Sequence, residues 1–272
     1  MCELLGMSSN RVATVNLSLM KLAEHGGFSG PHRDGWGVGY YEDTDIRLIK
    51  EAEAAADSDC IRFIRDHDLR SHIVMAHVRR ATIGARAYRN TQPFMRELAG
   101  CMHLFAHNGD LPAIRGTPEF AVKRFHTVGE TDSELAFCAL MDQLTELWQR
   151  PGVIPPIETR MACVGRFAAR LRRLGPANFL YSDGDALFAH GDRRMQAQTH
   201  RIQPPGLHYL SRSCEDGEPG LHASGVAIAG GGQRMIVLAS VPLTAEPWQT
   251  LAEGEVIAVC RGQIVLRQTP NP

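Results

Sequence analysis

The chain has 272 residues, which permits one large domain or two small ones, and we expect a single domain over residues 1–272. Its 29 Lys and Arg residues nearly balance 30 Asp and Glu residues, so the formal net charge of -1 gives no indication of nucleic acid or an anionic membrane as a partner. Seven scattered cysteines without a Cys-x-x-Cys pair, no signal peptide and no apolar run of about 18 residues predict a cytoplasmic protein with reduced thiols.

Hydrophobic periodicity and turn residues predict the elements of the first half of the chain. They predict, in order, a buried strand, a helix, a hairpin, a short helix and two more buried strands, over residues 2–7, 10–25, 38–49, 58–65, 73–78 and 102–106. Before the hairpin, Asp34-Gly35-Trp36-Gly37 predicts either a loop that approaches another group closely or a plain turn. After the last strand, Asn108-Gly109 is by itself a turn signal.

The second half of the chain changes from helices to strands. Helical segments are predicted to open at Thr117 and Thr131 and to cover residues 161–174, where a stripe of arginines indicates a solvated face. Strands are then predicted over residues 178–182, 186–190, 207–211, 226–229, 235–240, 255–260 and 263–266. Strands at both ends with helices between them predict an α+β protein in which antiparallel sheets pack against helices.

Cys2 is the first candidate for chemistry. Its small side chain allows removal of Met1, which would leave one residue with both a thiol and a free α-amine. The ordinary pKa of the amine is about 7.7–8.0 and that of the thiol about 8.5, so the amine is suited to accept the thiol proton near neutral pH. The alternative is a chance cysteine after the initiator methionine.

Acyl chemistry at Cys2 would need further groups, and four residues at the edges of predicted elements could supply them. The Asn108 amide and the Gly109 N–H can stabilise an oxyanion, although Asn-Gly is also an ordinary hairpin turn. Arg79, at the end of a buried strand, needs a partner for its charge and could bind a substrate carboxylate. Asp132, in the first turn of a helix, could bind an ammonium group or complement the helix dipole.

Two other kinds of site compete with this one. His103 and His107 have the spacing of zinc ligands on a helix, but their segment is predicted to be a strand, where residues four apart lie about 13 Å from each other. A papain-like Cys/His pair would use one of the cysteines within apolar or helical runs, which are typical of core thiols, namely Cys60, Cys101 or Cys163. We therefore expect no metal site and no cofactor.

The sequence resembles the class II glutamine amidotransferases, which belong to the N-terminal-nucleophile hydrolases. The resemblance covers essentially the whole chain and rests on ordered segments: Met1-Cys2, Asp34-Gly35-Trp36-Gly37, residues 77–84, residues 90–94, His107-Asn108-Gly109 and residues 131–134. Residues 182–184 and 246–248 are similar to features of stand-alone members. The resemblance implies a four-layer αββα sandwich, with two antiparallel sheets between helical layers.

The resemblance also implies a role for each candidate residue. Cys2 would attack the side-chain amide of glutamine, and Asn108 with the Gly109 N–H would hold the oxyanion. Arg79, helped by Thr82, would bind the α-carboxylate, and Asp132 would bind the α-ammonium. Where many relatives have Trp, His and His, this chain has Arg80, Ile83 and Gln92, which concern the substrate pocket.

Three functions are therefore open. The first is glutamine hydrolysis, either by this domain alone or with a separate synthase subunit that consumes the ammonia, since 272 residues leave no room for a fused synthase. The second is hydrolysis of a γ-glutamyl amide in a small peptide or metabolite intermediate. The third is an inactive binding scaffold. A homo-oligomer is compatible with each of them.

Overall fold

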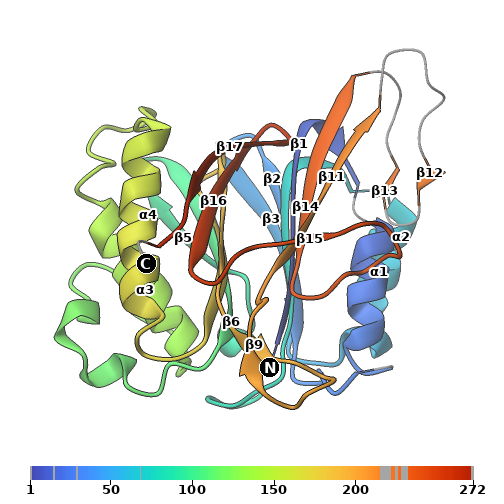
Figure 1. The fold of residues 1–272 in the computed structure, drawn as a ribbon, viewed down its shortest axis with the longest axis horizontal. Coiled ribbons are helices and arrows are strands. Elements are labelled where there is room, and N and C mark those ends of the chain that lie inside the picture. The colour runs from blue at the N-terminus through green and yellow to red at the C-terminus, as the bar shows by residue number, and fades with distance from the viewer. Residues whose placement is uncertain are drawn as a thin grey trace.

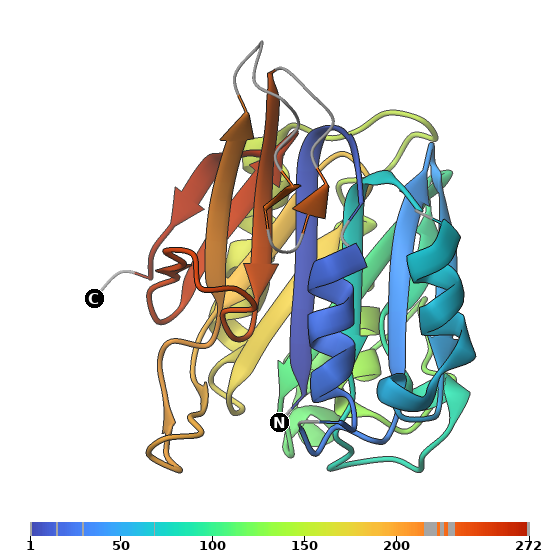
Figure 2. The same ribbon diagram turned by 90° about the vertical axis from the view of Figure 1, so that its right-hand side faces the viewer.

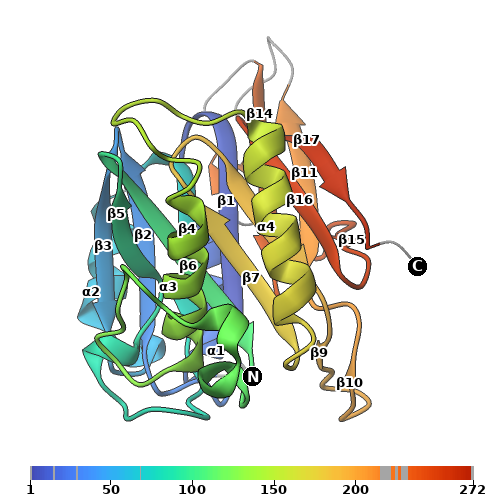
Figure 3. The ribbon, with the colours of Figure 1, turned by 90° about the vertical axis from the view of Figure 1, so that its left-hand side faces the viewer.

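The computed structural model describes residues 2–14, 16–28, 30–67, 69–214, 222–223, 226–227 and 232–270. Two large antiparallel sheets face each other at the centre of the molecule (Figure 1). One pair of helices covers the outer face of each sheet, as the turned views show (Figure 2, Figure 3). This arrangement confirms the αββα sandwich and the antiparallel sheets.

The seven-stranded sheet contains β1 (Glu3–Ala13), β2 (Trp36–Glu42), β3 (Asp45–Glu51), β4 (Ser71–Val78), β11 (His208–Cys214), β14 (Gln233–Ala239) and β15 (Gln249–Thr250). Its strand order is β15-β11-β14-β1-β4-β2-β3, which places β1 at the centre between β14 and β4. The outer face of this sheet carries α1 (Asn16–His25) and α2 (Asp59–His67).

The six-stranded sheet contains β5 (Phe94–Leu98), β6 (Cys101–Gly109), β7 (Ala177–Ser182), β8 (Leu187–Gly191), β16 (Glu255–Cys260) and β17 (Gln263–Gln268). Its strand order is β17-β16-β8-β7-β6-β5, and its outer face carries α3 (Asp132–Leu144) and α4 (Ile157–Leu171). Two small pairs complete the described strands: β9 (Arg194–Met195) with β10 (Ile202–Gln203), and β12 (His222–Ala223) with β13 (Val226–Ala227).

Three apolar cores separate the four layers. Successive residues of a strand face opposite sides, so Leu4 of β1 packs between the sheets while Leu5 packs toward α1. The third core, between the six-stranded sheet and its helices, is rich in aromatic side chains such as Phe105 and Phe137, whose rings stack with centroids 5.3 Å apart. No helix among the described residues is long and apolar enough to cross a membrane.

The predicted helix over residues 10–25 is wrong at its start. Residues 10–13 extend β1, and α1 begins only at Asn16. The Asn10 side chain continues the pairing with β14, because it donates to the Gly232 carbonyl at 2.9 Å and accepts from the Arg234 N–H at 2.8 Å. The helix was predicted from the spacing of apolar residues that include Val12 and Val15. Val12 belongs to β1 and is 50% exposed, and Val15 is not among the described residues.

Most other predicted elements occur where the sequence places them, with ends shifted by a few residues. The segment that opens at Thr117 is a single 3-10 turn over Pro118–Phe120, with proline at its first position. Of the strand predicted over residues 226–229, Val226–Ala227 forms β13 and the remainder lies outside the described residues. The strand β5 and the two-residue strands β9, β10, β12 and β15 were not predicted.

Candidate active site

Cys2 lies directly before β1 and next to the residues that follow β4. Its Sγ accepts from the Arg80 N–H at 3.3 Å and donates to the Arg80 carbonyl at 3.4 Å. Burial raises the pKa of the Cys2 thiol, the Arg80 hydrogen bond and the Arg79 charge lower it, and the Asp132 carboxylate raises it. The fold therefore places Arg79 and Asp132 each within electrostatic reach of Cys2. Met1 lies outside the described residues.

Arg79 is almost completely buried, with 3% of its surface exposed, and its guanidinium is bound by main-chain carbonyls. Nη1 donates to Asp34 at 3.3 Å and to Ala85 at 3.1 Å. Nη2 donates to Ile83 and Gly84, both at 3.0 Å. Each terminal nitrogen carries two hydrogens, so these bonds use all of them. A substrate carboxylate would have to bind at Nε or replace some of these carbonyls.

The loop before β2 holds the segment that carries Arg79. The Gly35 carbonyl accepts from the Arg79 N–H at 2.7 Å, and the Asp34 carboxylate accepts from the Ala81 N–H at 2.8 Å. Gly35 has a φ of +135°, which favours glycine. Of the two interpretations of this loop, the close backbone approach is therefore the one observed. Thr82 is exposed in the neighbouring loop, and its contact with a carboxylate stays a prediction.

Asn108 and Gly109 end β6 and do not form the turn that their sequence suggests. Asn108 lies opposite Asn178 of β7, is fully buried, and donates through Nδ2 to the Ser240 hydroxyl at 3.2 Å. A Cβ on Gly109 would lie 1.8 Å from the Pro176 carbonyl oxygen. Glycine is required here because the neighbouring backbone leaves no room for a side chain.

Ser240 and Gln92 contact this segment; Gln92 was connected with the substrate pocket from the sequence, whereas Ser240 was not predicted. The Ser240 hydroxyl accepts from the Leu4 N–H at 3.0 Å and so joins Asn108 to the strand that begins beside Cys2. The Gln92 amide accepts from the His107 N–H at 2.6 Å and donates to the His107 carbonyl at 3.3 Å, which extends the pairing of β6 beyond the start of β5. A glutamine amide can do this because it both donates and accepts.

Asp132 occupies the first turn of α3, as predicted. Thr131 caps this helix, because its hydroxyl accepts from the Glu134 N–H at 3.2 Å. The Asp132 carboxylate is 7% exposed and accepts from the Leu111 and Ser133 N–H groups, both at 2.8 Å. These donors are neutral, so the negative charge of Asp132 remains available to a substrate ammonium group.

The competing zinc hypothesis depended on a helix, and β6 is a strand as predicted. His103 Nδ1 bonds to the Tyr181 hydroxyl at 2.7 Å, while His107 Nδ1 bonds to the Ser133 hydroxyl at 2.9 Å. Within the described ranges, no three His, Cys, Asp or Glu side chains are grouped so that they could hold a metal ion. Of the cysteines considered for a papain-like pair, Cys101 and Cys163 are buried and Cys60 is partly exposed.

A cavity of about 900 Å³ is lined by two neighbours of Cys2 but not by Arg79 or Asp132. Glu3 follows Cys2 in the chain, and Arg80 contacts it. Both line this cavity, together with His25, Arg194 and His208. The Arg194 side chain also donates to the Ser240 carbonyl at 2.9 Å. Among the ionisable side chains that line this cavity, only Glu3 is acidic, and the others are arginine or histidine.

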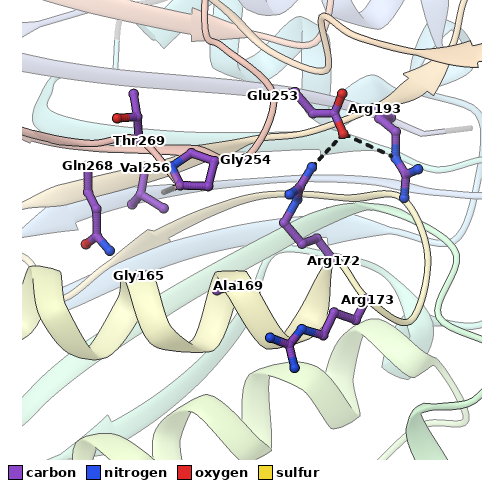
Figure 4. Close-up of a pocket in the computed structure, with 11 residues that line it drawn as sticks. Gly165, Ala169, Arg172, Arg173, Arg193, Glu253, Gly254, Val256, Gln268 and Thr269 are labelled. Carbon is purple, nitrogen blue, oxygen red and sulfur yellow. Dashed lines mark hydrogen bonds and ion pairs between the residues drawn. The ribbon is translucent and has the colours of Figure 1, made fainter. Parts of the chain in front are cut away.

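A second cavity, of about 680 Å³, lies beside α4 and contains none of the predicted site residues (Figure 4). Arg172 enters it and forms ion pairs with Asp192 at 2.9 Å and Glu253 at 2.6 Å. The arginine stripe of this helix is thus solvated at Arg166 and Arg173, as predicted, but Arg172 is partly buried in ion pairs. Asp192 and Glu253 thus compensate the charges of Arg172 and Arg193.

Glu3 and His25 form an ion pair beside Cys2, with Oε2 and Nδ1 2.7 Å apart. Burial alone would raise the pKa of Glu3, but the hydrogen bond and charge of His25, together with the charges of His32 and Arg194, outweigh it, so the pKa is lowered from 4.5. The same bond raises the pKa of His25 from 6.5. The ion pair therefore stabilises the fold between the ordinary pKa values of the two groups, 4.5 and 6.5. The contribution of His25 is lost as pH rises through its pKa in the folded protein.

Replacing His25 should consequently cost more stability in weak acid than in weak base. We expect the Tm difference between wild type and His25→Gln to be larger at about pH 5.5 than at about pH 8.5, because only protonated His25 pairs with the Glu3 carboxylate. Thermal denaturation of both proteins at the two pH values measures this. A Tm difference that does not change with pH would show that the ion pair adds no net stability.

Comparison with known proteins shows the family of the chain and agrees with its fold. The model of the family "Glutamine amidotransferases class-II" matches residues 1–272. "Putative glutamine amidotransferase YafJ" of Escherichia coli (strain K12) is 36% identical over 98% of this chain and 100% of its own length. A crystal structure described as a predicted glutamine amidotransferase from Pseudomonas aeruginosa has a TM-score of 0.66 and 29% identity, covering 97% of this chain and 100% of that one.

The fold likeness extends to a distant enzyme. Glutamine phosphoribosylpyrophosphate amidotransferase from B. subtilis has a TM-score of 0.59 at 15% identity, and the match covers 98% of this chain and 49% of that enzyme. That likeness shows the fold alone, whereas the family model and the E. coli relative cover almost the entire chain. The chain belongs to the class II glutamine amidotransferase family.

Proposed function

We propose that this protein hydrolyses the side-chain amide of glutamine and releases ammonia and glutamate. The observation that carries the proposal is the convergence on Cys2 of a buried cation, Arg79, and a carboxylate, Asp132. These two charges have the signs needed to bind the α-carboxylate and α-ammonium groups of glutamine. A substrate held between them would present its far end to the thiol.

In the proposed reaction, Met1 has been removed and the free α-amine of Cys2 takes the proton of the thiol. The sulfur forms a bond to the amide carbon, and the Asn108 amide and the Gly109 N–H bind the resulting oxyanion. The α-ammonium of Cys2 then protonates the amide nitrogen as the C–N bond breaks, which releases ammonia and leaves a γ-glutamyl thioester on the sulfur. Water, deprotonated by the same amine, attacks the γ-glutamyl thioester. The C–S bond then breaks and the Cys2 thiolate takes the proton back, so that glutamine and water yield glutamate and ammonia.

Of the two ways in which a carboxylate could bind Arg79, the proposal takes the exchange of partners at the terminal nitrogens. Its terminal nitrogens donate to four main-chain carbonyls, and Thr82 lies in the same loop as three of them. An α-carboxylate that replaced some of these carbonyls would form stronger, charge-assisted hydrogen bonds. Thr82, which is exposed, would then complete the carboxylate site from the moving loop.

A second candidate function is hydrolysis of a substituted γ-glutamyl amide. The 900 Å³ cavity favours it, because it adjoins Cys2 through Glu3 and Arg80 but is not lined by the groups proposed to bind the glutamyl head. An N-substituent on the scissile amide could therefore extend into it. An inactive scaffold is the least supported function, since Cys2, Arg79 and Asp132 are all present and close together.

Activity screening separates these functions. Protein shown by intact mass to lack Met1 is assayed with glutamine and with a panel of N-substituted γ-glutamyl amides. We expect hydrolysis of glutamine, and Arg80→Gln should change kcat/KM for substituted amides more than for glutamine, because only their substituents reach its side chain. Hydrolysis of no member of the panel by the processed protein would refute both enzymatic functions.

The proposal also covers the domain organisation, the location and the partners of the protein. The single domain over residues 1–272 would act in the cytoplasm, either alone, as a homo-oligomer, or with a separate synthase subunit that uses the ammonia. Size-exclusion chromatography with mass determination distinguishes these assemblies.

A further inference from the structure

Ser240 lies one residue beyond the end of β14 and outside every segment on which the family resemblance rests. Its surface is 0% exposed. Burying a hydroxyl costs free energy unless its hydrogen bonds are made, so the partners of this side chain indicate what it does.

Ser240 links the strand of the nucleophile to the other sheet. Its N–H donates to the Leu4 carbonyl at 3.1 Å and its hydroxyl accepts from the Leu4 N–H at 3.0 Å, which closes the pairing of β1 with β14 beside Cys2. The same hydroxyl accepts from Asn108 Nδ2 at 3.2 Å. Arg194 donates to the Ser240 carbonyl at 2.9 Å. Ser240 is therefore held from two directions while it binds Asn108.

The orientation of the Asn108 amide depends on this contact. Its Oδ1 is buried and has no hydrogen-bond partner among the residues that the structure describes. The terminal torsion of asparagine has a broad energy profile, so an unbound amide turns easily. With one Nδ2 hydrogen directed at Ser240, the second remains available to an oxyanion.

We propose that Ser240 is a positioning residue that orients the Asn108 amide toward the carbonyl attacked by Cys2, an inference that rests on the proposed amide hydrolysis. Ser240 touches no reacting atom and acts only through Asn108. Because an oxyanion forms only after attack, the orientation affects turnover and leaves the binding of glutamine almost unchanged.

Ser240→Ala should therefore lower kcat for glutamine about 10- to 100-fold and change KM by less than about threefold, since loss of an oxyanion donor costs about 10²–10³ and misorientation costs part of that. The rate at which iodoacetamide alkylates Cys2 should stay within about twofold of wild type, because alkylation generates no oxyanion. An equal loss of turnover and alkylation would mean that the substitution displaces Cys2, and would overturn the proposal.

A double-mutant cycle tests whether Ser240 acts through Asn108. In the Asn108→Ala background, Ser240→Ala should lower kcat by less than about twofold, because the amide that it orients is already gone. If the fall in kcat of the double variant equalled the product of the two single falls, Ser240 would act independently of Asn108. That result would contradict the inference.

Ser9 provides a matched control. It is 1% exposed, and its hydroxyl joins the same two strands away from Cys2, donating to the Arg234 carbonyl at 3.1 Å and accepting from Gln233 Nε2 at 3.2 Å. Ser9→Ala should lower Tm about as much as Ser240→Ala but change kcat by less than about twofold. A similar kcat loss in both would attribute the effect to sheet stability.

Two further outcomes keep the test decisive. If Ser240→Ala is insoluble, Ser240→Cys keeps nearly the same size but replaces the hydroxyl with a weak acceptor, and should also lower kcat at unchanged KM. A wild-type protein that hydrolyses no amide would refute the proposed function itself. Active wild type, impaired Asn108→Ala and unimpaired Ser240→Ala would refute only the role of Ser240.

Discussion

Cys2→Ala should abolish glutamine hydrolysis, with a loss of about 10⁴-fold or more in kcat, because no other group in the proposed reaction can form the thioester. Alanine is also small enough to permit removal of Met1, so the variant keeps the free α-amine and lacks only the sulfur. The two weak contacts between Cys2 Sγ and the Arg80 main chain contribute little to stability, and Tm should change little. Steady-state ammonia release and thermal denaturation measure the two quantities.

Cys60 gives the matched control for this loss. It is a partly exposed thiol on α2 and belongs to no part of the candidate site. Cys60→Ala should keep kcat within about twofold of wild type. Substantial glutamine hydrolysis by Cys2→Ala would exclude the thioester mechanism, even if the remaining site residues proved essential.

Asn108→Ala should produce the second largest effect, a fall in kcat of about 10²–10³ with little change in KM, because the amide is proposed to bind the oxyanion and not the ground-state substrate. Asn178, its buried neighbour on β7, offers a comparison. Asn178→Ala removes an amide of the same size and should lower Tm. Its fold-reduction in kcat should be smaller than that of Asn108→Ala by a factor of about ten or more.

The split between the kinetic constants decides what Asn108 does. If Asn108→Ala raised KM and left kcat unchanged, the amide would bind glutamine before reaction, and the assignment of the oxyanion site would be wrong. If both asparagine variants lost the same turnover, the effect would come from packing at the end of β6 and β7.

Most helices and strands could be predicted from the sequence because alternation and turn residues report local structure directly, whereas the four-layer arrangement was implied by the family resemblance. The main error of the prediction was the start of the first helix at residue 10. It arose because the exposed Val12 has the spacing of an apolar helix residue. There the Asn10 side chain extends β1 through contacts with Gly232 and Arg234, more than 200 residues away in the chain. Sequence periodicity contains no information about such a partner.

The candidate site could be predicted only in part. Cys2, Arg79 and Asp132 each lie at the end of a predictable element, and the fold brings those ends together. The Asn108-Gly109 dipeptide was ambiguous, because its strand conformation depends on pairing with the distant Asn178 and Ala177 of β7.

Other features of the site depend on the path of the chain in three dimensions. The four carbonyls around Arg79 come from the loop before β2 and the loop after β4. Ser240 is separated from its partners Asn108 and Leu4 by 132 and 236 residues. A single buried serine at the end of a strand has no local pattern that distinguishes it from an ordinary core residue.

Labelling with the glutamine analogue diazo-oxo-norleucine, followed by intact-mass measurement and peptide mapping, tests the central claim most directly. The mechanism predicts that the chain has lost Met1, that it gains one label, and that the label is on Cys2. A processed chain that gains no label, a label on another cysteine, or an active protein that retains Met1 would contradict the proposal that the N-terminal cysteine is the nucleophile.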